Sequence, residues 1–271
     1  MTYKKILNKI MKTLKLLAIA LIVSFTTTIN AQTADEIIAN YFENTGGVEN
    51  WEKLNGIKMS AKVNQNGMEI PLEIIQLKGG NQMTVINFQG KEIKQGVFDG
   101  ETLWATNFMT QKAEKSDQEA TDNMILNKND FPDSFLNYKK KNYTVELLDK
   151  ETIDGTETFK IKLVKEPIKV DGNEEEDVSF YFFDTENFVP IVVQSEIKSG
   201  QFKGQTSESK FSDYQEVEGI YFPFSLTQGL KGQAGQGITI DKIEVNPTVD
   251  KKEFEFPEEE AVETPAEEKT N

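Results

Sequence analysis

The stretch Asp177–Gln228 reads DVSFYFFDTENFVPIVVQSEIKSGQFKGQTSESKFSDYQEVEGIYFPFSLTQ, and its pattern decides the expected fold. Apolar side chains recur at every second position in runs that begin near Val178, Ile191 and Ile220. Successive side chains of a strand point to opposite faces, so each run places one apolar row on one face of a sheet. Short polar segments such as Ser199-Gly200 separate the runs, as turns do. The stretch therefore predicts an antiparallel meander.

The same alternation covers most of the chain. Between residues 57 and 108 it is interrupted by hairpin signals at Asn66-Gly67, Gly79-Gly80-Asn81, Gln89-Gly90 and Asp99-Gly100. Further strands are expected near 143–147, 159–163 and 238–245, the last with a bulge because Ile240 and Ile243 break the alternation. Large apolar residues are expected inside the sheet: Met83, Val85, Phe98, Trp104, Phe108 and Met109. The chain is therefore expected to be mainly β.

Short helices are expected at two places. A capping box at Thr33–Glu36 begins an apolar face of Ile37, Ile38, Tyr41 and Phe42, and a second short helix follows at 48–54. These helices either pack on the sheet or plug the mouth of a barrel. In the middle of the chain, the composition predicts helices at about 117–126 and 130–139, followed after two strands by a polar loop at 165–177.

Composition excludes several classes of function. The chain has 271 residues, a net charge of −15 and a pI near 4.6, so nucleic acid would be repelled. It contains no Cys and no His, which removes disulfides, thiol catalysis and the commonest general base. Two S-x-x-K matches, at Ser195–Lys198 and Ser207–Lys210, lie in strand patterns rather than at helix starts. We therefore expect no catalytic site, no metal, no cofactor and no enzyme activity.

Both ends of the chain differ in composition from the middle. Lysines precede an apolar run at 16–25, and small residues ending at Ala31 follow, which is typical of a cleaved secretory signal peptide. Residues 258–271 are rich in Glu and lack an apolar period, which is typical of a disordered tail. The expected organisation is a signal peptide at 1–31, one domain at 32–257 and an acidic tail at 258–271. We expect a periplasmic protein that begins at Gln32.

The whole chain after the expected signal peptide resembles the LolA/LolB-like family of outer-membrane lipoprotein-sorting proteins. The likeness rests on Ala34–Phe42, the turn Phe98–Trp104, Phe211–Tyr214 with Val217–Pro223, and Ile240–Asn246 with Phe254. The resemblance implies a curved, antiparallel, half-open β-barrel whose N-terminal and mid-chain helices form a lid over an apolar cavity. Carriers of this family hold the lid with an Arg. All 30 basic residues of this chain are Lys, so that latch is absent or replaced by Lys.

The resemblance also implies a function. The leading hypothesis is a periplasmic carrier or chaperone that binds acyl chains of lipoproteins or lipids, with an acylated lipoprotein or lipid as partner, a possible membrane partner in the envelope, and a monomeric state. The alternative is a non-enzymatic sensor or binding module on the same fold that regulates an envelope partner. The residues expected to line the lipid cavity are Ile70, Leu72, Val85, Trp104, Phe180, Phe182 and Val193.

Overall fold

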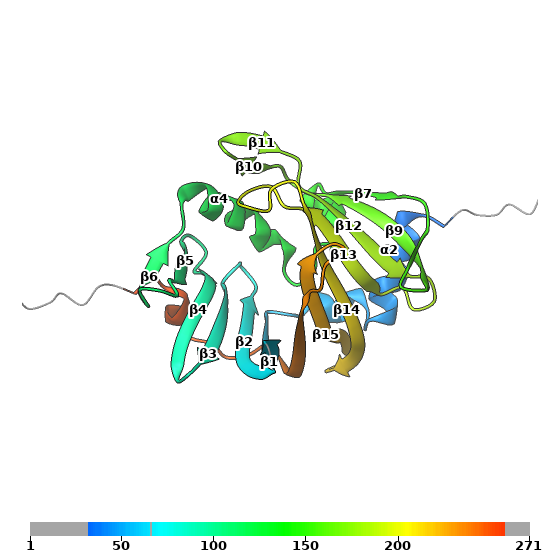
Figure 1. The fold of residues 1–271 in the computed structure, drawn as a ribbon. Coiled ribbons are helices and arrows are strands. Elements are labelled where there is room, and N and C mark those ends of the chain that lie inside the picture. The colour runs from blue at the N-terminus through cyan, green and yellow to red at the C-terminus, as the bar shows by residue number, and fades with distance from the viewer. Residues whose placement is uncertain (1–31, 66, 258–271) are drawn as a thin grey trace, which may run out of the picture. The chain divides into compact units, whose positions relative to one another are not determined.

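The computed structural model describes residues 32–65 and 67–257, drawn in Figure 1. The expected signal peptide and acidic tail lie outside the described residues. Strand is the predominant secondary structure of the described residues, as the alternation predicted. The strands of the main sheet are β1 (Gly56–Gln65), β2 (Met68–Leu77), β3 (Gln82–Phe88), β4 (Lys91–Phe98), β5 (Leu103–Thr106), β6 (Ala113–Lys115), β7 (Thr144–Leu147), β8 (Glu151–Ile153), β9 (Thr156–Val164), β12 (Val178–Asp184), β13 (Pro190–Glu196), β14 (Thr206–Val217), β15 (Ile220–Leu230) and β16 (Gln236–Val245).

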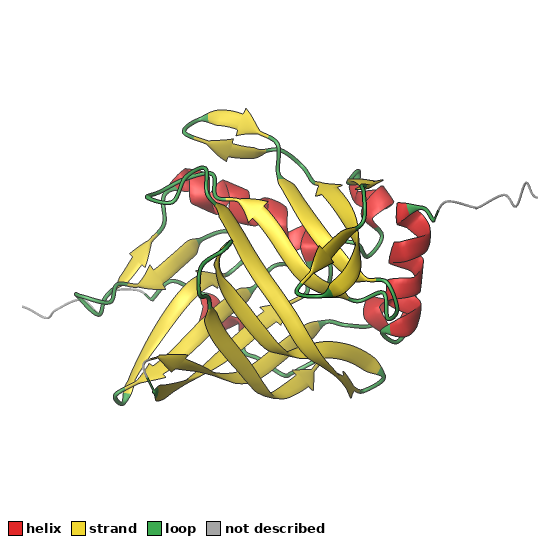
Figure 2. Ribbon diagram, turned by 45° about the vertical axis from the view of Figure 1, so that its right-hand side comes forward, coloured by secondary structure: helices red, strands yellow, loops and turns green. Residues whose placement is uncertain are grey.

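These strands form one antiparallel sheet that does not close into a barrel. Within the described residues its order is β6-β5-β4-β3-β2-β1-β16-β15-β14-β13-β12-β9-β7, with β8 pairing beside β7 on β9. The first and last strands pair in the middle of the sheet, and the bulge expected in β16 is present as a register shift opposite Ser60 and Ala61. We call β1–β6 the first limb and the remaining strands of this sheet the second limb. The half-open β architecture is thus confirmed, and Figure 2 shows its strands and helices.

The two outer strands of the sheet, β6 and β7, follow one another in the chain. They do not pair with each other, and residues 116–143 connect them. We call residues 116–143 the crossing segment. It contains α4 (Gln118–Asn127), the short 3₁₀ turns η1 (Lys128–Asp130) and η2 (Tyr138–Lys141), and irregular chain between them. Figure 1 shows α4 lying across the space between the two limbs.

The first predicted mid-chain helix is confirmed and the second is wrong. Asp117 caps α4 by accepting a hydrogen bond from the backbone N–H of Ala120 at 2.7 Å. The second prediction, at 130–139, fails because a proline disfavours the helical conformation of the residue before it, and Phe131 before Pro132 is extended, with φ −75° and ψ 137°. The side chain of Asp133 instead accepts from the N–H of Phe135 at 2.7 Å, which satisfies that donor locally.

The loop expected at 165–177 is partly ordered as a hairpin. Strands β10 (Ile168–Val170) and β11 (Asn173–Glu175) pair with each other, separate from the main sheet. They are joined by Asp171 and Gly172, both of which have a positive φ. A type I′ turn needs a positive φ at both central residues and therefore favours Asp-Gly. A loop was expected here because the polar composition of the segment was followed and this turn signal was not used.

The helices α2 (Ala34–Asn44) and α3 (Val48–Glu52) cover one face of the sheet, which we call the helix face. The predicted apolar face of α2 is buried, and so are Trp51 and Leu54. At Gly46, between the helices, an added Cβ would lie 2.1 Å from the carbonyl oxygen of Gly219 in the β14–β15 turn. Only glycine permits this approach, so the helix pair is held against the second limb.

A second apolar cluster lies on the opposite face of the first limb. It contains Met83, Val85, Val97 and Trp104, and the C-terminal Phe254 is fully buried against them. The indole N–H of Trp104 donates to the carbonyl oxygen of Phe254 at 2.9 Å. The C-terminal end of the domain is thereby docked on the sheet.

Two of the large residues expected inside the sheet are exposed. Phe108 is 58% exposed and Met109 is 92% exposed. Strand β5 ends at Thr106, and the chain turns there, with Gln111 N–H donating to the carbonyl of Asn107. The expected continuation of the strand to Phe108 is therefore wrong, and these side chains lie at a hairpin tip.

The position of Phe254 gives a sharp stability prediction for the C-terminus. Truncation after Pro257 should leave the melting temperature within a few degrees, because the removed residues have no apolar row to bury. Phe254→Ala should instead cost about 3–5 kcal/mol, because a fully buried phenylalanine is lost. Thermal unfolding followed by circular dichroism compares the two. A large loss on truncation would show that residues 258–271 dock on the domain.

Candidate functional site

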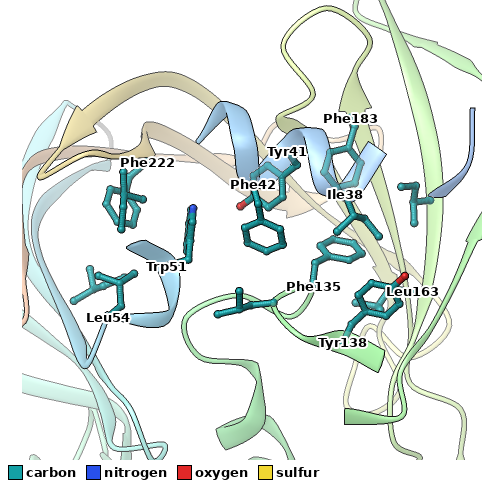
Figure 3. Close-up of a cluster of buried hydrophobic side chains, with 14 of the residues drawn as sticks. Ile38, Tyr41, Phe42, Trp51, Leu54, Phe135, Tyr138, Leu163, Phe183 and Phe222 are labelled. Carbon is teal, nitrogen blue, oxygen red and sulfur yellow. The ribbon is translucent and has the colours of Figure 1, made fainter. Parts of the chain in front are cut away.

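The helix face is largely filled by packed side chains. Figure 3 shows that Tyr41, Phe42 and Trp51 of the helices meet Phe183 and Phe222 of the sheet. The ring centroids of Tyr41 and Phe183 are 5.7 Å apart, and those of Trp51 and Phe222 are 5.6 Å apart. Edge-on and tilted contacts at these distances add to the free energy of burial. This part of the helix face is a core and leaves no room for a ligand.

A cavity of about 470 Å³ remains beside that core. It is bounded by the β2–β3 turn of the first limb, by β12 and β14 of the second limb, and by residues 127–134 of the crossing segment. Its lining residues are Gln76, Leu77, Gly80, Asn81, Gln82, Asn127, Lys128, Asp130, Phe131, Pro132, Asp133, Ser134, Tyr181 and Phe211. We call it the limb cavity, because it lies where the two limbs and the crossing segment meet.

The crossing segment closely approaches the first limb at one end of the limb cavity. At Gly80, whose φ is +103°, an added Cβ would lie 2.7 Å from Cβ of Lys128. A larger residue would push the crossing segment away, so the glycine sets how closely this segment covers the cavity.

Three of the residues predicted to line the lipid cavity do lie on the helix face. Leu72 belongs to the buried core, and Ile70 pairs with Val63 of the same core. Val193 pairs with Tyr181, which packs against that core. Directly opposed residues of neighbouring strands share a face, which places all three side chains on the helix face. None of them lines the limb cavity.

The other four predicted residues lie on the opposite face of the sheet. Val85 and Trp104 belong to the cluster that buries Phe254. Phe180 pairs with Lys162, and Phe182 pairs with Lys160. The alternate residues of the same strand, Tyr181 and Phe183, pack in the core on the helix face. The ammonium of Lys160 lies 5.1 Å and 5.3 Å from the ring centroids of Phe180 and Phe182. The expectation that all these residues share one concave surface is therefore wrong.

Sequence reasoning missed the residues that line the limb cavity. Tyr181 belongs to the same strand as Phe180 and Phe182, but its side chain points to the other face of the sheet. Both faces of this strand carry large side chains, so the sequence did not show which one lines a cavity. Phe211 sits in the polar strand β14, and Leu77 ends β2 at the turn. The signal for Phe211 was a large aromatic residue within an otherwise polar strand. Such a residue indicates that this position of the strand faces apolar surroundings rather than solvent.

A buried polar cluster forms the wall of the limb cavity on the crossing-segment side. Oδ2 of Asp133 accepts a hydrogen bond from the hydroxyl of Tyr41 at 3.0 Å. Burial raises the pKa of the Asp133 carboxyl above its usual value, although its hydrogen bonds act in the other direction. Burial also raises the pKa values of Tyr41, Tyr181 and Tyr214, so these neighbours are neutral hydroxyls.

Beside this carboxyl lies an ion triad. The ammonium of Lys165 is 2.8 Å from Oδ2 of Asp130 and 2.9 Å from Oδ2 of Asp177. The Lys165 side chain is 15% exposed, so water screens these contacts little. Tyr143 donates its hydroxyl to Oδ1 of Asp130 at 3.0 Å. The triad ties the crossing segment to the ends of β9 and β12.

The β10–β11 hairpin holds the helix α4 in place. The side-chain amide of Asn123 exchanges two hydrogen bonds with the backbone of Lys169, at 2.7 and 2.8 Å. The carboxylate of Glu119 accepts from the N–H groups of Asp171 and Gly172 at 3.0 and 2.7 Å. These contacts, with an ion pair between Lys169 and Asp122, hold the mid-chain helix against the β10–β11 hairpin.

These contacts predict a local effect on the hairpin. Glu119→Ala combined with Asn123→Ala should increase amide hydrogen exchange in residues 168–175 and leave β14 and β15 unchanged, because only the hairpin loses partners. Gln118→Ala is the matched control, since its amide contacts only Asp122 of the same helix. Equal exchange in the double variant and the control would refute the role of these contacts.

The described residues contain no arrangement of three or more Asp or Glu that could hold a metal ion. None of the helices among residues 32–65 and 67–257 is long and apolar enough to cross a membrane.

No family model matches the chain, and no curated protein matches it. Solved structures similar to this chain over most of its length include the following three, each with a TM-score below 0.5. A LolA superfamily protein from Nitrosomonas europaea matches with a TM-score of 0.49 and 14% identity, over 83% of this chain and 98% of that one. A DUF1329 family protein from Desulfovibrio piger gives 0.49 and 12%, over 81% and 97%. A Vibrio parahaemolyticus domain named for outer-membrane lipoprotein sorting gives 0.46 and 9%, over 81% and 94%.

Proposed function

We propose that this protein binds an acyl chain of a lipid or lipoprotein in the limb cavity and carries it through the periplasm, in outer-membrane lipoprotein sorting. The supporting observation is the cavity itself, which lies between the limbs of an open sheet under the crossing segment. Its volume of about 470 Å³ falls in the range of small-molecule sites, roughly 300–1,000 Å³.

The lining of the limb cavity suits an amphiphile. Leu77, Phe131, Pro132, Tyr181 and Phe211 offer apolar surface. Each methylene buried there would contribute about 0.8 kcal/mol of binding free energy before entropic costs. The polar residues of the crossing segment face the same space and can satisfy a head group. We therefore assign binding, not catalysis, to this site.

The proposed location follows from the N-terminal pattern. Export with cleavage after Ala31 would release an acidic periplasmic protein, whose partners would be an acylated lipoprotein or lipid and a membrane component of the envelope. We propose that it acts as a monomer.

Native mass spectrometry after mild extraction tests the proposal. We expect co-purified lipid or acylated protein, released when the protein is denatured. Titration of the delipidated protein with an uncharged fluorescent acyl probe should then show saturable binding. An empty protein that fails to bind the probe would refute the carrier function.

The filled helix face favours a second candidate, a non-enzymatic binding module that regulates an envelope partner. The depression beside α2, of about 450 Å³, opens between Ile38, Phe42 and Leu136, and the neighbouring Val48 is 43% exposed. A protein partner could contact this surface while the limb cavity stays empty. Absence of lipid together with a stable complex in an envelope extract would support this candidate.

A further inference from the structure

We propose that the limb cavity selects amphiphiles that carry a primary ammonium group, with the carboxylate of Asp133 as its counter-ion. This inference rests on the proposed acyl-binding function and specifies the class of head group. It is carried by the position of one carboxylate, by the charge balance around it, and by the apolar surface next to it.

The carboxylate of Asp133 has unused acceptor capacity. It receives one hydrogen bond from Tyr41 and one from the N–H of Phe135, whereas a carboxylate has about four acceptor positions. Among the described residues, no lysine ammonium forms an ion pair with it. The nearby Lys141 donates instead to the backbone carbonyls of Asp133, at 3.2 Å, and Asn129, at 3.3 Å. Asp133 is half-buried and lines the limb cavity, so a ligand can reach it.

The charges around Asp133 do not balance. At the Asp133 end of the cavity, Asp130, Asp133 and Asp177 supply three carboxylates, and Lys141 and Lys165 supply two ammonium groups, so this cluster has one negative charge in excess. The remaining groups that face Asp133, on α2, β12 and β14, are the tyrosine hydroxyls described above. A buried charge without a partner is costly, and burial already raises the pKa of Asp133. A ligand ammonium would supply the missing positive charge.

The apolar surface lies next to this charge. Phe131 and Pro132 precede Asp133 directly, and Tyr181 and Phe211 line the cavity from the second limb. The other cation at the cavity, Lys128, is exposed and lies at the Gly80 end. A head group bound beside Lys128 would have to be an anion, whereas one bound beside Asp133 would have to be a cation. The charge of the preferred ligand therefore shows which end of the cavity binds the head group.

Three probes with the same chain separate these predictions: dodecylamine, dodecanol and dodecanoic acid. Each is titrated, below its micellar concentration at neutral pH, as a competitor of the uncharged acyl probe. We expect dodecylamine to bind about tenfold or more tighter than dodecanol, because a hydrogen bond between charged groups is stronger than one between neutral groups. Equal affinities, or a preference for the acid, would overturn the inference while leaving acyl binding intact. Failure of all three probes would instead refute the proposed function.

Asp133→Asn removes the charge. Its amide oxygen can still accept from the N–H of Phe135, and its amide N–H can donate to the hydroxyl oxygen of Tyr41. We expect the preference for dodecylamine over dodecanol to disappear, while the circular dichroism spectrum stays unchanged. Asp213→Asn, in the exposed part of β14, is the matched control and should keep the preference. An amine preference that survives in Asp133→Asn would overturn the inference.

The pH dependence gives a second readout. The preference for the amine should fall as pH decreases through the pKa of Asp133, which burial places above the usual 3.8. A preference for the amine that stays constant as the pH is lowered to 3.8 would show that another group binds the ammonium.

Discussion

Phe211→Asp should abolish binding of an uncharged acyl probe while the domain stays folded. Phe211 lines the limb cavity from β14, is only half-buried, and lies outside both buried clusters. The substitution removes apolar contact area from the site and places a carboxylate where the chain should lie. We expect affinity to fall by about a hundredfold or more. Water in the cavity can hydrate the new carboxylate, so we expect the melting temperature to change by only a few degrees.

Phe180→Asp is the matched control for this experiment. Phe180 belongs to the same sheet but to the face away from the helices, where Lys160 covers its ring. The new carboxylate would meet an ammonium, and the limb cavity would be unaltered. Probe titration and circular dichroism on both variants decide the matter. Equal loss of binding, or retained binding in Phe211→Asp, would contradict the assignment of the cavity.

Lys165→Met should destabilise the domain by about 3–5 kcal/mol. The substitution leaves the carboxylates of Asp130 and Asp177 facing each other in a largely buried place without their shared cation. The side chain of methionine fills most of the lysine volume, so the loss measures charge rather than packing. Chemical denaturation at neutral pH measures the change.

Lys210→Met is the control for this measurement. Its ammonium lies 2.6 Å from Oδ2 of Asp154, but both side chains are substantially exposed, at 42% and 74%. Exposed pairs contribute about 0–1 kcal/mol, so this variant should be close to the parent. A similar loss of stability in both variants would show that burial of the triad does not increase its contribution to the free energy of unfolding.

The contribution of Lys165 to stability should also depend on pH. Burial alone lowers the pKa of Lys165, but Asp130 and Asp177 more than compensate and raise it above the usual 10.5. A lysine with a raised pKa contributes its full stabilisation below its ordinary value and loses it as pH rises through the raised one. The difference between parent and Lys165→Met should therefore persist at neutral pH and shrink in strong alkali.

Local patterns determined most of the secondary structure. The hairpin signals and alternating rows predicted the strands, because a half-buried strand shows its period in any short window. The apolar face of α2 was evident from its helical spacing, and the composition indicated a helix at about 117–126, where α4 lies. The helix predicted at 130–139 failed at Pro132, where a local rule was available and composition was followed instead.

The functional site depended on the tertiary structure. A period of two shows that Phe180 and Phe182 share a face, but it cannot show whether that face is also the face of Leu72 or of Val85. That relation is set by the register between strands, which here depends on pairings such as β1 with β16, far apart in the chain. The alternation and turn signals by themselves therefore determined a mainly β, antiparallel chain with short helices, and the family resemblance supplied the half-open architecture. The fold decided that Tyr181 and Phe211 meet Asp133 around one cavity, because strand pairing and the path of the crossing segment bring them together.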